Sequence, residues 1–122
     1  MATRSNIVIR DEFGDIILYH HYDGYPETVG ARVKQTFSDK LANGFASAER
    51  IAKELVCLTK VEEDGYTWDF VPTTSIHADI QYLYLIDCES ETFTGYKVKR
   101  WNMSLEEIVN DKNIVKVPDS VE

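Results

Sequence analysis

The chain begins with two runs of β-branched and other apolar residues that are separated by a polar turn. The first run covers residues 6–10 and the second covers residues 15–22. Residues 11–14 between them read Asp-Glu-Phe-Gly, and the glycine can adopt the positive φ that a tight turn needs. This pattern predicts an N-terminal β-hairpin.

Apolar residues then recur every four positions, which is the spacing of one buried helix face. The stripe consists of Tyr25, Val29, Val33, Phe37 and Leu41. Asn43 and Gly44 can end this helix with a left-handed residue, and Ser47 can cap a second helix. The apolar positions of the second helix are Ala48, Ile51, Ala52, Leu55 and Leu58. Gly30 falls inside the first helix, where we expect it to permit close packing.

The second half of the chain alternates between residues typical of strands and polar turns. Residues 62–65 form such a turn, and the alternation over residues 66–71 predicts a strand that Pro72 ends. A longer strand is predicted over residues 76–87 and another over residues 92–101.

A short helix is predicted after the last long strand, because Ser104 and Glu107 have the spacing of a capping box. The order of elements is therefore β-β-α-α-β-β-β-α in a single domain over residues 1–122. We expect an α+β fold with a five-stranded, mainly antiparallel sheet, two consecutive helices inserted after the first hairpin, and a short C-terminal helix. We expect the helices to pack on one face of the sheet.

Composition narrows the class of protein. The 122 residues are 43% hydrophobic, and none of the apolar runs is long enough to cross a bilayer. The N-terminus lacks the apolar core of a signal peptide, so we expect a cytoplasmic protein. Cys57 and Cys88 lack the spacing of a metal or redox site, and we expect both to be small buried hydrophobic residues.

The chain is acidic, with a formal net charge of −8 from 21 acidic and 13 basic residues. This charge argues against binding to nucleic acid polymers, because affinity for a phosphate backbone depends on clustered lysine and arginine. A negative surface favours solubility. It is also compatible with a basic protein partner.

The densest group of polar and aromatic residues lies where the hairpin meets the first helix. Residues 19–27 read Tyr-His-His-Tyr-Asp-Gly-Tyr-Pro-Glu, and we call this stretch the junction. Gly24 can take backbone angles closed to other residues, and Pro26 suits the first turn of a helix. We expect Asp23 to accept backbone N–H groups at the helix start.

His20, His21 and Asp23 are the candidates for metal binding or catalysis. Adjacent strand residues point to opposite faces, so we expect no metal site from the two histidines. The sequence contains no nucleophile elbow and no phosphate-binding glycine loop. We predict neither an enzyme nor a cofactor, and a small hydrolase that uses these three residues is the last-ranked hypothesis.

Cationic and aromatic residues near the junction and on the last long strand are candidates for ligand binding. An aromatic ring can stack on a base, and arginine or lysine can neutralise a phosphate. On the strand, the same residues are also typical of a charged edge that prevents aggregation. The candidate ligand-binding residues are Arg4, Tyr19, His21, Tyr25, Arg32, Tyr96, Lys97, Lys99, Arg100 and Trp101.

The N-terminal Met-Ala-Thr-Arg, the hairpin and the His-Tyr-Asp-Gly-Tyr-Pro stretch together resemble a group of small phage and prophage proteins. The junction of that group usually reads Cys-His-Trp-Asp-Gly-Tyr-Pro, from which His20 and Tyr22 depart. The likeness covers about the first quarter of the chain. Through this group the chain also resembles the phage anti-defence proteins that act against Thoeris immunity.

The resemblance implies a protein of the infected host's cytoplasm that sequesters a cyclic ADP-ribose-type signal without cleaving it. It also implies a homo-oligomer with pockets between protomers. The alternative hypothesis is an acidic interaction module that inhibits a host defence protein by direct contact.

Overall fold

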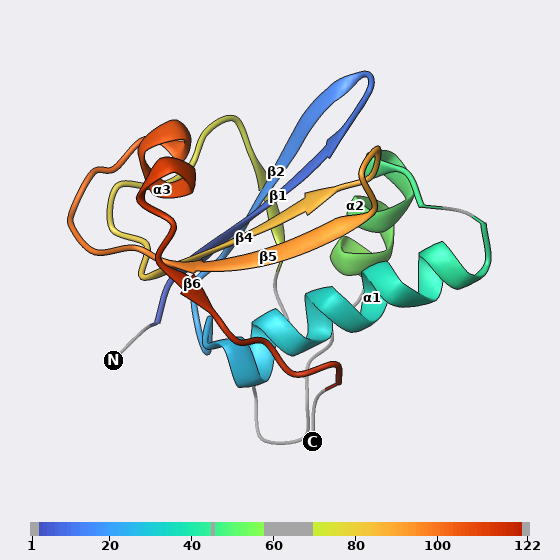
Figure 1. The fold of residues 1–122 in the computed structure, drawn as a ribbon, viewed down its shortest axis with the longest axis horizontal. Coiled ribbons are helices and arrows are strands. Elements are labelled where there is room, and N and C mark those ends of the chain that lie inside the picture. Colours follow the sequence, from blue (N-terminus) through green and yellow to red (C-terminus); the bar gives the residue numbers. More distant parts are fainter. Residues whose placement is uncertain (1–2, 45, 58–69, 121–122) are drawn as a thin grey trace.

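The computed structural model describes residues 3–44, 46–57 and 70–120, and its fold is α+β as predicted (Figure 1). The hairpin consists of β1 (Ser5–Asp11) and β2 (Gly14–His20), and a π-helical turn η1 (Pro26–Gly30) leads directly into α1 (Ala31–Ala42). The remaining elements are α2 (Ala48–Cys57), β3 (Val71–Thr73), β4 (Tyr82–Asp87), β5 (Thr92–Lys97), α3 (Leu105–Asp111) and β6 (Ile114–Val115).

The sheet of the described residues is mixed and has six strands in the order β3-β2-β1-β4-β5-β6, where five strands were expected. β1 lies at its centre, antiparallel to β2 and parallel to β4, so that Ile7 faces Leu18 on one side and Tyr84 on the other. The other neighbouring strands are antiparallel. The added strand, β6, has two residues, which is too short to produce a recognisable alternation.

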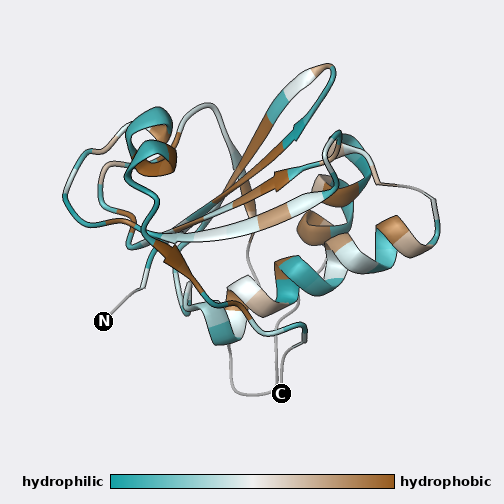
Figure 2. Cartoon of the chain, in the orientation of Figure 1, coloured by the Kyte–Doolittle hydropathy of each residue, from teal (hydrophilic) through white to brown (hydrophobic). Residues whose placement is uncertain are grey.

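The helices cover both faces of the sheet, so the expectation of one covered face is wrong. α1 and α2 pack against Ile7 and Ile9, whereas α3 packs through Ile108 against Val8. The physical reason lies in β1, where the consecutive residues Ile7, Val8 and Ile9 are all fully buried. Neighbouring strand residues point to opposite faces, so a run of this kind needs cover on both sides. Long hydrophobic stretches mark these central strands in Figure 2.

Several strands are shorter than expected. β2 stops at His20, β4 begins only at Tyr82, and β5 stops at Lys97. Pro72 lies inside β3 and does not end a strand, which the edge position of β3 allows. The expected turn at residues 62–65 and most of the strand expected over residues 66–71 lie outside the described residues, as does Leu58.

Local signals in the sequence are confirmed at the helix ends. Gly44 has a φ of 74° after α1, and the Ser47 hydroxyl accepts the Arg50 N–H at 3.2 Å. Ser104 and Glu107 form the predicted capping box at the start of α3. Cys57, however, is exposed, and Cys88 is only half-buried, which corrects the expectation that both are buried. None of the helices described is long and apolar enough to cross a membrane.

Candidate functional site

The backbone of the junction turns sharply at Asp23. Its φ is 54°, whereas Gly24 does not have a positive φ, so the expectation that Gly24 supplies the unusual angle is wrong. Gly24 is needed for a different reason. A Cβ at this position would lie 2.6 Å from the Thr3 carbonyl oxygen, whose partner is the Gly24 N–H at 2.8 Å.

The helix start is held by backbone groups of the junction. The Asp23 carbonyl oxygen accepts the Val29 N–H at 3.4 Å and also accepts the Thr28 hydroxyl. The backbone of Asp23, and not the carboxylate that was expected, is therefore the acceptor. Pro26 occupies the first helical turn as predicted.

Tyr19 is the centre of a polar and aromatic cluster on the sheet face that α3 covers. Its hydroxyl lies 2.8 Å from Nδ1 of His21, and its ring stacks on His77 with centroids 3.8 Å apart. Burial, reinforced by Asp79, raises the pKa of Tyr19. The hydroxyl therefore keeps its proton at neutral pH, and the tautomer of His21 decides which of the two groups donates in this hydrogen bond.

The segment before β4, residues 76–81, crosses the end of the sheet. The His77 N–H donates to Oδ1 of Asn6 at 2.7 Å, and the Gln81 N–H donates to the Arg4 carbonyl oxygen at 2.9 Å. Arg4 also pairs with Asp79 at 3.3 Å. The residues Arg4, Tyr19, His21, His77 and Asp79 thus come together, and we call them the sheet-end cluster.

His77 and Asp79 are members of this cluster that sequence reasoning did not select. His77, Asp79 and Gln81 stand at every second position, so a strand would place all three on one polar face. This spacing is the signal in the sequence that could have identified His77 and Asp79. Nδ1 of His77 is buried and has no hydrogen-bond partner among the described residues. A buried ring nitrogen without a partner is uncommon, so His77 is a notable member of the cluster.

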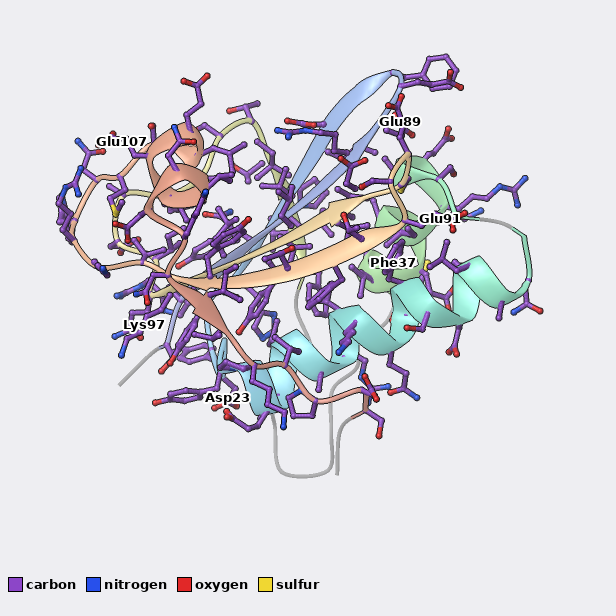
Figure 3. The ribbon with its side chains drawn as sticks, in the orientation of Figure 1. Asp23, Phe37, Glu89, Glu91, Lys97 and Glu107 are labelled. Atoms are coloured by element: carbon purple, nitrogen blue, oxygen red, sulfur yellow. The ribbon has the colours of Figure 1, made fainter. Side chains whose placement is uncertain are left out.

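The loop after β5 lies beside the same segment. The Val98 N–H donates to the Gln81 carbonyl oxygen at 2.9 Å, and the Asn102 N–H donates to the Ala78 carbonyl oxygen at 2.8 Å. This loop carries Trp101, which is 73% exposed. Members of both predicted groups of ligand-binding residues therefore reach one end of the sheet, where Figure 3 labels Asp23 and Lys97.

The cations at the end of β5 and in this loop differ in their partners. Lys99 lies 3.6 Å from Asp111, and Arg100 pairs with Glu107. Lys97 forms no ion pair with any residue of the described ranges.

Three of the predicted ligand-binding residues lie neither in the cluster nor among residues 97–101, at the end of β5 and in the loop after it. Tyr96 is only 7% exposed and belongs to the core under α3. Tyr25 is 46% exposed, but its ring lies beside Tyr82 on the other face, with centroids 6.1 Å apart. Arg32 lies at the start of α1, which covers that other face.

His20, His21 and Asp23 do not converge on a common point. His20 is 3% exposed and packs on Phe70 with ring centroids 4.8 Å apart, whereas His21 contacts Tyr19 and Tyr22 on the opposite face. Within the described ranges there is no group of three or more His, Cys, Asp or Glu residues that could hold a metal ion.

Acidic residues gather at the opposite end of the sheet, at the turns that join β1 to β2 and β4 to β5. Glu12, Glu89 and Glu91 are exposed there, and the carboxylates of Asp11 and Asp87 are beside Cys88. Figure 3 labels Glu89 and Glu91 far from Lys97 and Asp23. The two ends of the sheet therefore differ in character.

Comparison with known proteins gives no relative: no family model, curated protein or solved structure matches the chain.

Proposed function

We propose that this protein binds and sequesters a cyclic ADP-ribose-type nucleotide without cleaving it, in the cytoplasm of a phage-infected host. The observation that carries the proposal is that exposed aromatic rings and cations meet at the sheet-end cluster. Such a nucleotide offers base faces for stacking and a pyrophosphate for cationic groups.

The aromatic part of the site is accessible. Trp101 is 73% exposed and Tyr22 is 56% exposed, and Tyr22 meets His21 edge-on at 4.5 Å. Exposure of an aromatic ring to water is unfavourable, so two exposed rings at one end of the sheet favour a binding role. Stacking on such rings contributes about 1–3 kcal/mol per base.

The cationic part can exchange its present partners for phosphate. The side chains of Arg4 and Asp79 are 36% and 31% exposed, and an ion pair this open is worth at most about 1 kcal/mol. A charge-assisted bond to a phosphate contributes about 1.5–3 kcal/mol, so releasing Arg4 from Asp79 is favourable overall. Lys97 has no ion pair to lose within the described part of the chain.

Sequestration without cleavage agrees with the arrangement of the histidines. A protein that only binds need not stabilise a transition state. His20 is buried on one face and His21 is hydrogen-bonded to Tyr19 on the other, so the pair does not present an acid and a base to one bond.

Thermal unfolding with a panel of cyclic ADP-ribose isomers tests the proposal. A ligand at one thousand times its dissociation constant stabilises the native state by about 4 kcal/mol, which raises the melting temperature by several degrees. Mass spectrometry after heat release should recover that ligand unchanged. No shift with any isomer would refute the proposal, and recovery of a converted product would favour the hydrolase.

Variants then locate the site. We expect Arg4→Ala, Lys97→Ala and Trp101→Ala each to weaken binding of the ligand found, by about 1.5–3 kcal/mol for the two cations. Lys53→Ala is the matched control, because Lys53 is an exposed cation on α2. Equal affinity in all four variants would remove the sheet-end cluster from the proposal.

The acidic end of the sheet favours a second candidate, direct inhibition of a basic host protein. This candidate predicts a stoichiometric complex whose affinity falls steeply with salt and that does not depend on Arg4 or Trp101. Binding that is indifferent to salt would argue against it.

A further inference from the structure

Phe13 lies at the tip of the β1–β2 hairpin and is 90% exposed. The hairpin projects from the body of the molecule, and its tip is the outermost part at that end in Figure 1. Glu12 beside Phe13 is also exposed. An aromatic ring held away from the core at a projecting tip has the form of an anchor for another surface.

The tip is rigid because the Asp11 carboxylate bridges two segments. Its Oδ1 accepts the Phe13 N–H at 2.9 Å, and its Oδ2 accepts the Ala48 N–H at the start of α2 at 3.1 Å. Arg10 and Asp15 add a two-point pair across the hairpin, at 2.8 and 3.1 Å. An anchor that is already ordered loses little conformational entropy on binding.

A groove at the β5–β6 edge of the sheet has matching properties. It has a volume of about 470 Å³, and its apolar wall includes Phe93, Ile114, Val117 and Pro118. Ile114 is 62% exposed although it is a large apolar residue. Lys34 and Lys116 lie on its rim.

The two rim lysines have different roles. Nζ of Lys34 is held by the Val117 carbonyl oxygen at 3.0 Å and by Asp119 at 2.9 Å. Lys116 is exposed and makes no ion pair with any described residue. Glu12, Glu89 and Glu91 around the tip likewise form no ion pair in the described ranges. Tip and groove are thus complementary in both apolar character and charge.

We propose that the Phe13 tip of one copy inserts into this groove of a second copy, with Glu12 facing Lys116. In Figure 1 the tip projects above the sheet, whereas β6 lies below β5 and is separated from β1 by two strands, so the tip of a chain does not reach its own groove. Because two different surfaces meet, the contact is head-to-tail and repeats into a ring or an open chain of copies. This interface is independent of the nucleotide proposed above.

Sedimentation velocity over a range of concentrations tests the proposal without any ligand. The wild-type chain should associate beyond a monomer, and Phe13→Ser and Ile114→Ser should each raise the dissociation constant at least about tenfold. Val71→Ser is the matched control, because Val71 is 44% exposed on the distant edge strand β3 and should leave association unchanged.

A mixture of the two variants gives the sharper result. Phe13→Ser keeps an intact groove and Ile114→Ser keeps an intact tip, so equal amounts should form a one-to-one dimer that neither forms alone. Glu12→Lys should weaken association, and Lys116→Glu in the same chain should restore it. A monomeric wild type, a Phe13→Ser variant that associates normally, or a mixture that stays monomeric would each overturn the proposal.

Discussion

The hydroxyl of Tyr84 donates a hydrogen bond to the Gly24 carbonyl oxygen at 2.6 Å. Tyr84 is fully buried in β4, and Gly24 lies in the junction sixty residues earlier, so this bond joins the centre of the sheet to the turn beside the sheet-end cluster. The junction is therefore positioned from the core.

Replacing Tyr84 with phenylalanine should lower the free energy of unfolding by about 1–3 kcal/mol, because the Gly24 carbonyl oxygen loses its buried donor. Urea unfolding measures the change. Tyr82→Phe is the control, because Tyr82 is half-buried and its hydroxyl has no hydrogen bond to the described residues. Equal losses of unfolding free energy in both variants would show that the hydrogen bond to Gly24 does not contribute to stability.

Gly30→Ala should destabilise the protein even though alanine is the better helix former. A Cβ at position 30 would lie 2.8 Å from Cε1 of Tyr84, and this ring is fixed by its bond to Gly24. Overpacking of this kind costs about 1–3 kcal/mol, which exceeds the propensity gain of about 1 kcal/mol. Ser38→Ala, exposed on α1, should be neutral or slightly stabilising in the same unfolding experiment. A gain in stability for Gly30→Ala would contradict the packing argument.

Asp23 should tolerate glycine and reject valine, because its φ is 54°. The left-handed conformation costs a residue with a Cβ about 1–2 kcal/mol, and β-branched residues fare worst there. Thermal unfolding should give Asp23→Gly close to the wild type and Asp23→Val lower by at least that amount. Glu27→Val, an exposed change one turn later, is the control. Similar melting temperatures for the glycine and valine variants at position 23 would be inconsistent with the strained angle.

Stability should fall as the pH rises above about 8.5, the value near which an unfolded cysteine titrates. Burial, reinforced by Asp11 and Asp87, raises the pKa of Cys88 to about 11 in the folded protein. Between these two values the unfolded chain has lost a proton that the native state keeps, so alkali favours unfolding. Urea unfolding across this range should show a decline that Cys88→Ala removes and that Cys57→Ala, at an exposed site, leaves in place.

A second decline should begin above about pH 10, where an unfolded tyrosine titrates. Burial raises the pKa of Tyr84 well above that value, so the native state keeps the phenol proton after the unfolded chain has lost it. Tyr84→Phe should flatten this part of the profile.

The sequence predicted features that depend on neighbours within one helical turn. Ser47 and the Ser104–Glu107 pair cap their helices by bonds across three residues, and Gly44 ends its helix by its own φ. The prediction of a strand over residues 76–81 is wrong. These residues alternate between apolar and polar as a strand does, but their hydrogen-bond partners lie far away in the chain. The His77 N–H bonds to Asn6, 71 residues earlier, and local patterns carry no information on such a contact.

For the candidate site, too, the sequence showed the chemical character of the residues but not their contacts. Arg4, Tyr19 and His21 were selected because charge and aromatic character are visible in the sequence, and the fold brings them together. Tyr96 was selected for the same reason, yet β5 turns it into the core under α3. The consecutive run Ile7-Val8-Ile9 did contain the information that both sheet faces need cover, because strand geometry alone requires it.

The position of β1 at the centre of the sheet has a consequence for biosynthesis. The ribosome makes β1 before the other strands of this sheet, and β2 can pair with one of its edges almost at once, but the other edge belongs to β4, which is made about seventy residues later. Until then Ile7, Val8 and Ile9 border an unpaired edge that can capture other extended segments. The nascent chain therefore passes through a stage in which its most hydrophobic strand is open to misassembly, and closure of the β1–β4 pair sets the end of that stage.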